Sequence, residues 1–212
     1  MNFDRLAPHY GWMELAFAGP LMQRCRTQFL TESGRFHRAL LLGEGRGRFL
    51  LRLMKTNPHV RITCVEKSGA MVRCMLAKIK KSGLDPSRVD FQQMDALDWR
   101  ARGRRYDLLA THFFLDCFTA ETLEGLVMEL AAAASPGATW LVSDFRVPDR
   151  GWRKWRARAL LRLLYDFFWI TTGLSARNLV PPGQYLRKAG FWLEERRLEN
   201  AGFAYSERWT LI

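Results

Sequence analysis

The segment Arg38-Ala-Leu-Leu-Leu-Gly-Glu-Gly-Arg-Gly-Arg-Phe-Leu-Leu-Arg-Leu-Met54 places a short apolar strand directly before three alternating glycines and a helical pattern. Glycine permits positive φ and a close approach of the backbone to a ligand, and a helix that begins near Gly47 offers N–H groups to a polar ligand. A second apolar run ends in Glu66, about 20 residues beyond the glycines, where a ribose-binding acid is expected. Together these features predict a nucleotide-cofactor site.

The spacing of the glycines separates two kinds of cofactor. A dinucleotide fingerprint G-x-G-x-x-G needs a glycine at position 48, where this chain has Arg48, so that the pattern here is G-x-G-x-G. This pattern favours S-adenosylmethionine over a nicotinamide.

The order of motifs over residues 3–145 resembles that of the class I S-adenosylmethionine-dependent methyltransferases. The leader, Phe3-Asp-Arg-Leu-Ala-Pro-His-Tyr10, is similar to that of the ubiquinone/menaquinone-biosynthesis type. The family usually has an acid two residues before its first glycine, but this chain has Leu41 there and carries Glu44 between the glycines instead. Either Glu44 takes over the polar contacts, or the methionine end of the cofactor is held differently.

The resemblance implies S-adenosyl-L-methionine as cofactor and S-adenosyl-L-homocysteine as product. We expect Glu66 to accept hydrogen bonds from the ribose hydroxyls, Met71 to pack against the adenine, and Asp95 to accept from the adenine amino group. The alternatives are a solvent-facing charge for Glu66, plain core packing for Met71 and a helix cap for Asp95. The full set of expected cofactor contacts is Tyr10, Gly43, Glu44, Gly45, Gly47, Glu66, Lys67, Met71, Asp95, Ala96 and Thr111.

The fourth strand pattern ends in Ala110-Thr-His-Phe-Phe-Leu-Asp116, where the acceptor of this family meets the methyl group. With an unperturbed pKa near ~6.5, His112 is a candidate base, and Asp116 is a candidate to orient it. The alternative is a histidine hydrogen-bonded beneath a lid, because many such transferases need no side-chain base. The other candidate substrate contacts, for which ordinary packing is the alternative, are Trp12, Phe113, Phe114, Phe145, Arg146 and Tyr165.

Strand and helix patterns alternate along the middle of the chain. Strands are expected at residues 38–42, 62–65, 89–92, 106–111 and 138–145, the last introduced by a turn at 135–137, and a closing antiparallel pair at 191–198 and 203–211. This rhythm predicts an α/β, Rossmann-like, doubly wound seven-stranded sheet with a reversed final strand. Helical patterns at 4–18 and 21–33, separated by Gly19-Pro20, predict an N-terminal helical lid.

The chain has 212 residues and is 48% hydrophobic, which suits one domain with one core. Within it we expect a lid (1–34), a cofactor-binding core (35–147), a basic aromatic helical insertion after the fifth strand (148–182), and a closing helix with antiparallel strands (183–212). The four cysteines form no C-x-x-C pair, so we expect no metal site and no disulfide framework.

The formal charge of +12 would draw the protein toward anionic surfaces. Basic residues crowd the segment from Arg146 to Arg162, in which Asp149 is the only acid. They are Arg146, Arg150, Arg153, Lys154, Arg156, Arg158 and Arg162. The aromatic residues between them are typical of a helix lying on an anionic membrane surface, and the alternative is a pocket lid with a solvated basic face. Because the chain shows no signal-peptide layout and no long uncharged apolar run, we expect a cytoplasmic protein with peripheral contact at the inner face of a membrane.

These features predict methyl transfer to a small or lipid-like, largely apolar acceptor by in-line displacement in an enclosed pocket. Oxygen, carbon and nitrogen acceptors stay open. An RNA methyltransferase is favoured by the charge, but Thr111-His-Phe-Phe114 differs from the Pro-Pro-aromatic signature used on exocyclic amines. A non-catalytic cofactor-binding module is the third hypothesis, which Leu41 keeps open.

Overall fold

The computed structural model describes residues 19–30, 36–148, 150–172 and 179–212, with the backbone alone described at 19, 153 and 164–172. Its centre is a seven-stranded sheet in the order β3-β2-β1-β4-β5-β7-β6. The strands are β1 Arg38–Leu42, β2 Arg61–Val65, β3 Val89–Gln92, β4 Tyr106–His112, β5 Ala134–Phe145, β6 Phe191–Glu199 and β7 Ala204–Leu211. Only β7 among them runs antiparallel to its neighbours, β5 and β6. The predicted doubly wound sheet with a reversed final strand is confirmed.

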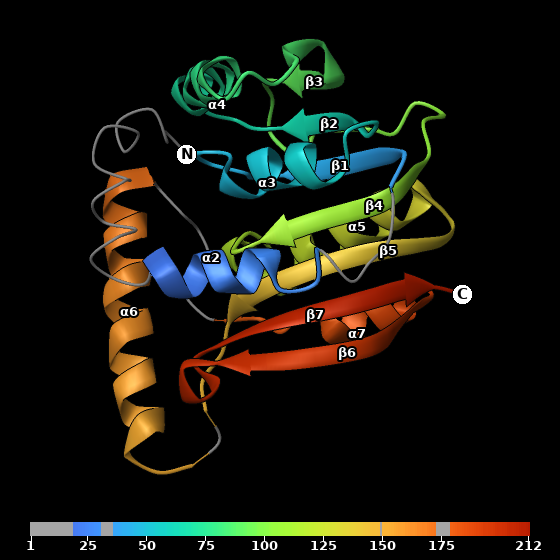
Figure 1. Cartoon of the computed structure of the whole chain (residues 1–212). Helices are drawn as coiled ribbons and strands as arrows, with labels where there is room; N and C mark the ends of the chain where they lie inside the picture. Colours follow the sequence, from blue (N-terminus) through green and yellow to red (C-terminus); the bar gives the residue numbers. More distant parts are fainter. Residues whose placement is uncertain (1–18, 31–35, 149, 173–178) are drawn as a thin grey trace.

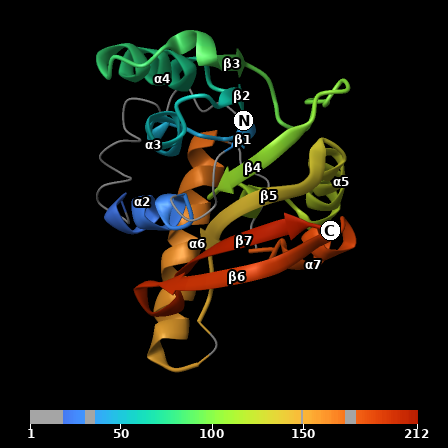
Figure 2. The same ribbon diagram turned by 45° about the vertical axis from the view of Figure 1, so that its right-hand side comes forward.

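Helices cover both faces of this sheet (Figures 1 and 2). One face carries α3 Arg48–Thr56 and α4 Gly69–Lys81, and the other carries α5 Ala120–Ala132 and α7 Gly183–Lys188. Short 3-10 turns, η2 Pro86–Arg88, η3 Leu115–Cys117 and η4 Asn200–Gly202, join some of the elements.

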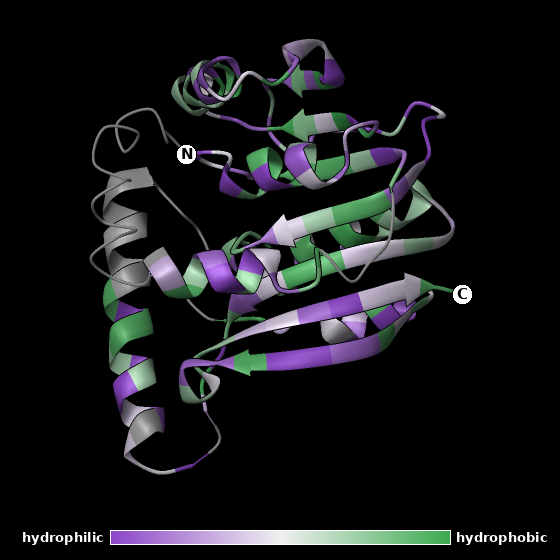
Figure 3. Ribbon diagram, in the orientation of Figure 1, coloured by the Kyte–Doolittle hydropathy of each residue, from purple (hydrophilic) through white to green (hydrophobic). Residues whose placement is uncertain are grey.

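The central strands carry apolar residues in succession, as the colouring of β1, β4 and β5 in Figure 3 shows. Successive side chains of a strand point to opposite faces. In β1, Ala39 and Leu41 therefore pack in the cluster under α3 and α4, whereas Leu40 and Leu42 pack in the cluster under α5 and α7. A strand buried on both faces explains the continuous apolar run of β1 in the sequence.

Two further helices, α2 Gly19–Thr27 and α6 Trp152–Thr172, lie at the carboxyl ends of the parallel strands (Figure 1). They share a third apolar cluster with the ends of β5 and β7, made of Leu21, Met22, Cys25, Phe145, Ala157, Leu161, Phe203 and Ala204. The carbonyl of Cys25 also accepts hydrogen bonds from the hydroxyls of Ser143 and Ser206, at 3.2 and 2.9 Å. The sheet edge where a ligand is expected thus has an apolar cover.

Two element boundaries differ from the predicted ones. The α2 helix begins at Gly19, two residues before the predicted start, because proline fits the first helical turn, where its missing N–H costs no bond. Residues 135–137 belong to β5 and form no separate turn. Ala134 pairs with Tyr106, and the register then shifts before Leu108 pairs with Thr139, next to Gly137 at φ 72°. The predicted helix at 4–18 lies outside the described residues.

Candidate active site at the carboxyl edge of the sheet

The glycine loop between β1 and α3 lies where the strand order reverses from β1 to β4, a usual place for a ligand in open α/β sheets. Gly43, Gly45 and Gly47 all have positive φ, at 64°, 55° and 69°. A Cβ on Gly43 would lie 2.3 Å from Cδ2 of Phe114. Both the backbone conformation and this close contact require glycine at position 43, so that the sequence motif has a structural cause.

Glu66 follows the last residue of β2 and is buried. Its carboxylate accepts hydrogen bonds from the N–H of Gly45 at 3.1 Å and from the N–H of Ser68 at 3.0 Å. The side chain therefore points at the glycine loop. A carboxylate in this position is where paired ribose hydroxyls would donate.

The neighbouring candidates lie on the same edge. Met71 is buried in the first turn of α4, where its N–H donates to the hydroxyl of Ser68. Asp95, beyond β3, forms an ion pair with Lys67 at 2.7 Å and also accepts from the N–H of Leu97. Desolvation raises the pKa of Asp95, but the hydrogen bonds from Lys67 and from the N–H of Leu97, together with the charge of Lys67, outweigh it, so the pKa of Asp95 is lowered. Ala96 is buried beside them.

Leu41 stands two residues before the first glycine, where the family usually has an acid, and Glu44 lies between the glycines instead. Leu41 is fully buried in the core, and Glu44 turns toward α3, where its carboxylate accepts from the N–H of Leu50 at 3.1 Å. Burial raises the pKa of Glu44 to about 7, and the positive charge of Arg26 opposes that rise. Glu44 thus accepts a hydrogen bond from an N–H in the first turn of α3. Its carboxylate is therefore directed at α3 and does not take the place of an acid at position 41.

His112 ends β4 beneath α2 and is buried. Its Nδ1 lies 3.2 Å from the hydroxyl of Ser143, and its ring contacts Phe49 edge to face at 4.6 Å. No partner for Nε2 occurs among the described residues. Burial and, to a smaller extent, the charge of Arg26 together lower the pKa of His112 to about 3, so the ring is neutral at physiological pH. This geometry favours a hydrogen-bonded histidine beneath the lid over a base.

Other side chains at the ends of β4 and β5 face the opposite side. The hydroxyl of Thr111 accepts from the indole of Trp140 at 2.9 Å. Asp116, in η3, groups with Asp144 at the end of β5, and not with His112. Burial and then the Asp116 carboxyl raise the pKa of Asp144 well above its usual range.

An apolar row runs from the end of β4 toward α6. The rings of Phe113 and Phe145 lie 4.8 Å apart, and those of Phe145 and Phe203 lie 5.3 Å apart. Phe113 adopts φ 55°, an uncommon conformation for an aromatic residue, and Arg26 lies over its ring at 5.5 Å. The N–H of Arg146 donates to the carbonyl of Phe203 at 2.8 Å.

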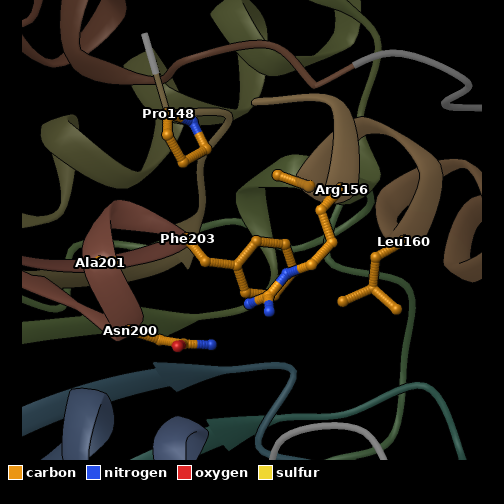
Figure 4. A pocket seen from close by; sticks show the side chains of 7 residues that line it. Pro148, Arg156, Leu160, Asn200, Ala201 and Phe203 are labelled. Atoms are coloured by element: carbon orange, nitrogen blue, oxygen red, sulfur yellow. The ribbon is translucent and has the colours of Figure 1, made fainter. Parts of the chain in front are cut away.

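The row ends at a pocket between α6 and η4 (Figure 4). Its lining residues are Pro148, Arg156, Ala157, Leu160, Asn200, Ala201 and Phe203. Figure 4 shows Arg156 and Leu160 of α6 near Phe203 and Asn200. Its volume of about 30 Å³ has room for only one or two water molecules and is well below the size of a small-molecule site.

Some predicted contacts lie outside the described residues: Tyr10 and Trp12 altogether, and the side chain of Tyr165. Phe114 packs against Gly43 and Phe118, with ring centroids 5.1 Å apart in the second case. Two residues that the sequence reasoning did not single out are prominent here. Arg26 is a buried cation on the apolar face of α2, and Asp144 is an acid that ends an apolar strand as Glu66 does. The position of Asp144, an acid at the end of an apolar run, could have been recognised from the sequence.

Among the described residues, no three His, Cys, Asp or Glu side chains gather as a metal site would need. The polar groups of the edge instead suit an organic cofactor with hydroxyls, an amino group and a carboxylate.

Residues 39–137 match the family model described as "Methyltransferase domain". This span holds the glycine loop, Glu66, Asp95 and His112. No curated protein matches the chain.

Solved structures resemble the whole fold. An O-methyltransferase family protein from Burkholderia thailandensis is 17% identical with a TM-score of 0.71; the match covers 97% of this chain, which spans 59% of that one. The N-methyltransferase NodS from Bradyrhizobium japonicum WM9, solved with S-adenosyl-L-homocysteine, is 15% identical with a TM-score of 0.67, and 92% and 88% of the two chains are covered. The [4+2]-cyclase SpnF is 16% identical with a TM-score of 0.63, with 87% and 79% covered.

The fold is the one that these methyltransferase structures share, a class I S-adenosylmethionine-dependent methyltransferase fold. Residues 39–137 match a methyltransferase domain, and this match supports the enzyme class and the cofactor that the sequence predicts.

Proposed function

We propose that this protein transfers the methyl group of S-adenosylmethionine to a small or lipid-like, largely apolar acceptor. The observation that carries the cofactor assignment is the Glu66 carboxylate, buried at the end of β2 and 3.1 Å from the N–H of Gly45. The observation that supports an apolar acceptor is the row of Phe113, Phe145 and Phe203, which runs from the end of β4 toward α6.

Several residues of the edge would hold the cofactor. Glu66 would accept from the ribose hydroxyls, Asp95 from the adenine amino group, and Met71 would pack against the ring. The buried guanidinium of Arg26 lies close enough to Glu44 to lower its pKa, and it supplies the positive charge that a methionine carboxylate needs. In this assignment a cation from α2 holds the methionine end through its carboxylate, and no acid at position 41 is needed.

The bound sulfonium supplies an already activated methyl group, so the protein contributes mainly position and a dry environment. A lone pair on the acceptor would form the new bond to carbon as the bond from sulfur to carbon breaks, S-adenosylhomocysteine would leave, and the proton released by the acceptor would pass to solvent. Buried and neutral, His112 holds Ser143 and the end of β4 in place, and it takes no proton near pH 7. The apolar row excludes water from the reacting atoms.

Isothermal titration calorimetry with S-adenosylmethionine and S-adenosylhomocysteine tests the cofactor assignment. Incubation of a metabolite extract with isotopically labelled methyl donor, followed by mass spectrometry, tests the transfer and identifies the acceptor. Binding of both nucleosides and a labelled product of apolar character are expected. Labelled RNA in the same extract would instead support the RNA methyltransferase.

A second candidate is a cofactor-binding protein that does not transfer the methyl group. The fold of SpnF, named a [4+2]-cyclase, is shared by this chain, and Glu44 does not replace the usual acid. Tight calorimetric binding without any labelled product would favour this candidate.

The resemblance to the ubiquinone/menaquinone type rests on residues 3–10, which lie outside the described residues. A quinone-like ring is one member of the acceptor class proposed above. We also propose a cytoplasmic location, in keeping with four free thiols. No helix among the described residues is long and apolar enough to cross a bilayer.

A further inference from the structure

The outer side of α6 exposes large apolar side chains. Trp152 is 65% exposed, Trp155 is 70% exposed and Leu163 is 58% exposed. The inner side holds Ala157 and Leu161, which are buried in the apolar cluster shared with α2 and the ends of β5 and β7. The helix lies along one side of the molecule in Figure 1.

These exposed residues form one stripe. With 3.6 residues per turn, Trp152, Trp155, Ala159 and Leu163 fall on the side of the helix opposite Ala157 and Leu161. Packing against the body thus fixes which side of α6 faces outward. We call Trp152, Trp155, Ala159 and Leu163 the outer stripe.

Cations flank this stripe. Arg156 lies over the ring of Trp152 at 5.2 Å, and Arg158 lies over the ring of Trp155 at 5.6 Å. Arg162 is exposed beside Leu163. From position 150 to position 163 the sequence contains no acid. The arrangement of indole rings and arginines on one helical face is confined to this element among the described helices.

We infer that the outer stripe docks on the surface of an anionic lipid bilayer, with α6 lying in the plane of the interface. Indole rings prefer the boundary between headgroups and acyl chains, an apolar stripe between cations matches that boundary, and arginines attract anionic headgroups. Leu163 and Ala159 offer nothing for a nucleobase to stack on, which separates this surface from a single-strand RNA site. The inference is independent of methyl transfer. It would place the pocket lined by Arg156 and Leu160 beside the membrane.

Flotation of the full chain with vesicles tests the inference. Phosphatidylcholine vesicles containing phosphatidylglycerol should carry the protein at low salt, less of it should float at high salt, and pure phosphatidylcholine vesicles should carry little. Brominated phospholipid in the anionic vesicles should quench tryptophan fluorescence, because the rings of Trp152 and Trp155 enter the depth of the bromine atoms.

Matched variants locate the surface. Trp152→Ser with Trp155→Ser should abolish the quenching by bromine and weaken flotation, whereas Trp192→Ser, at a side chain 63% exposed on β6, should leave both unchanged. Arg158→Gln with Arg162→Gln should lower the partition coefficient by roughly fivefold for each arginine, on the order of 20-fold together. Arg73→Gln with Lys80→Gln, at exposed positions of α4, should have a much smaller effect.

Thermal unfolding and calorimetry with S-adenosylmethionine show whether each variant is folded. Equal losses in the α4 and α6 charge variants would overturn the inference, because binding would then follow net charge alone. Quenching that survives in the Trp152→Ser, Trp155→Ser variant would also overturn it. A different outcome would assign the surface to RNA instead. The protein would then fail to float on anionic vesicles, and a labelled RNA would bind the parent protein but not the Arg158→Gln, Arg162→Gln variant.

Discussion

Glu66 shows how one carboxylate can define a cofactor site. Glu66→Gln preserves the shape of the side chain but removes its charge and one acceptor atom. Because a hydrogen bond to a charged group contributes roughly 1.5–3 kcal/mol, we expect S-adenosylmethionine to bind about 10- to 100-fold more weakly. Calorimetry measures this, and Glu121→Gln, at an exposed residue of α5, should bind like the parent protein. An unchanged affinity in Glu66→Gln would contradict its role at the ribose.

His112 should stay neutral where other histidines titrate. Burial and then the charge of Arg26 lower its pKa to about 3, so the folded state disfavours protonation. The stability gained from neutral His112 is present above the unfolded pKa near ~6.5 and is lost as the pH falls toward about 3. In a proton NMR titration, the chemical shifts of its ring protons should therefore stay constant between pH 5 and 8. The His112→Gln variant, which lacks these resonances, assigns them. A midpoint near neutrality would restore it as a candidate base.

Asp144 is an acid whose protonated form the fold favours. Its pKa is raised, chiefly by burial, so its contribution to stability is present below the unfolded pKa near ~3.9 and is lost as the pH rises toward the folded value. Asp144→Asn should therefore unfold at a higher temperature than the parent protein at alkaline pH, with a smaller advantage in acid. Thermal melts across the pH range measure this, with the exposed Asp98→Asn as control. Equal destabilisation at every pH would refute the assignment.

The glycine loop is the element whose conformation the sequence predicts most directly. An alanine at Gly43 would hold φ 64° and bring its Cβ 2.3 Å from Phe114. We expect Gly43→Ala to lower the free energy of unfolding by about 1–3 kcal/mol in urea titrations. The cost should be smaller in a Phe114→Ala background, because that contact is then absent. Gly125→Ala, in α5 with open space around its Cβ, should be neutral or stabilising by up to about 1 kcal/mol. A Gly43→Ala protein as stable as the parent would exclude the strain.

The elements also show what can be read without a structure. The strands were predictable because each apolar run ends in a turn residue or a charge, and the end of β2 gave Glu66 its position. Boundaries failed where local and tertiary effects compete: Ala134 pairs with Tyr106 and carries β5 through a proline and a glycine that predict a turn. At the site, the partners of a polar side chain were unreadable, since Ser143, not Asp116, meets His112 from a strand 31 residues away.

At the scale of the molecule, segments from far apart in the chain cover one edge of the sheet. The α2 helix precedes the core and α6 follows β5, yet both pack against Phe145 and Phe203 in one cluster. A cofactor bound beneath this cover would contact the core and, through Arg26, the lid. Its binding free energy should therefore stabilise the whole fold and not the glycine loop alone.

That coupling predicts a thermal shift. A ligand that binds only the folded state stabilises it by about 2.7 kcal/mol at a free concentration about 100 times its Kd. For a chain of this length that corresponds to a rise in Tm of about 5–10 °C. S-adenosylmethionine and S-adenosylhomocysteine should each produce it, Glu66→Gln should reduce it at the same concentration, and Arg26→Gln should reduce it as well because the guanidinium is the proposed partner of the methionine carboxylate. Adenosine, which lacks that carboxylate, should lose the dependence on Arg26 while keeping the dependence on Glu66. Equal shifts in all three proteins with S-adenosylmethionine would mean that the cofactor binds elsewhere.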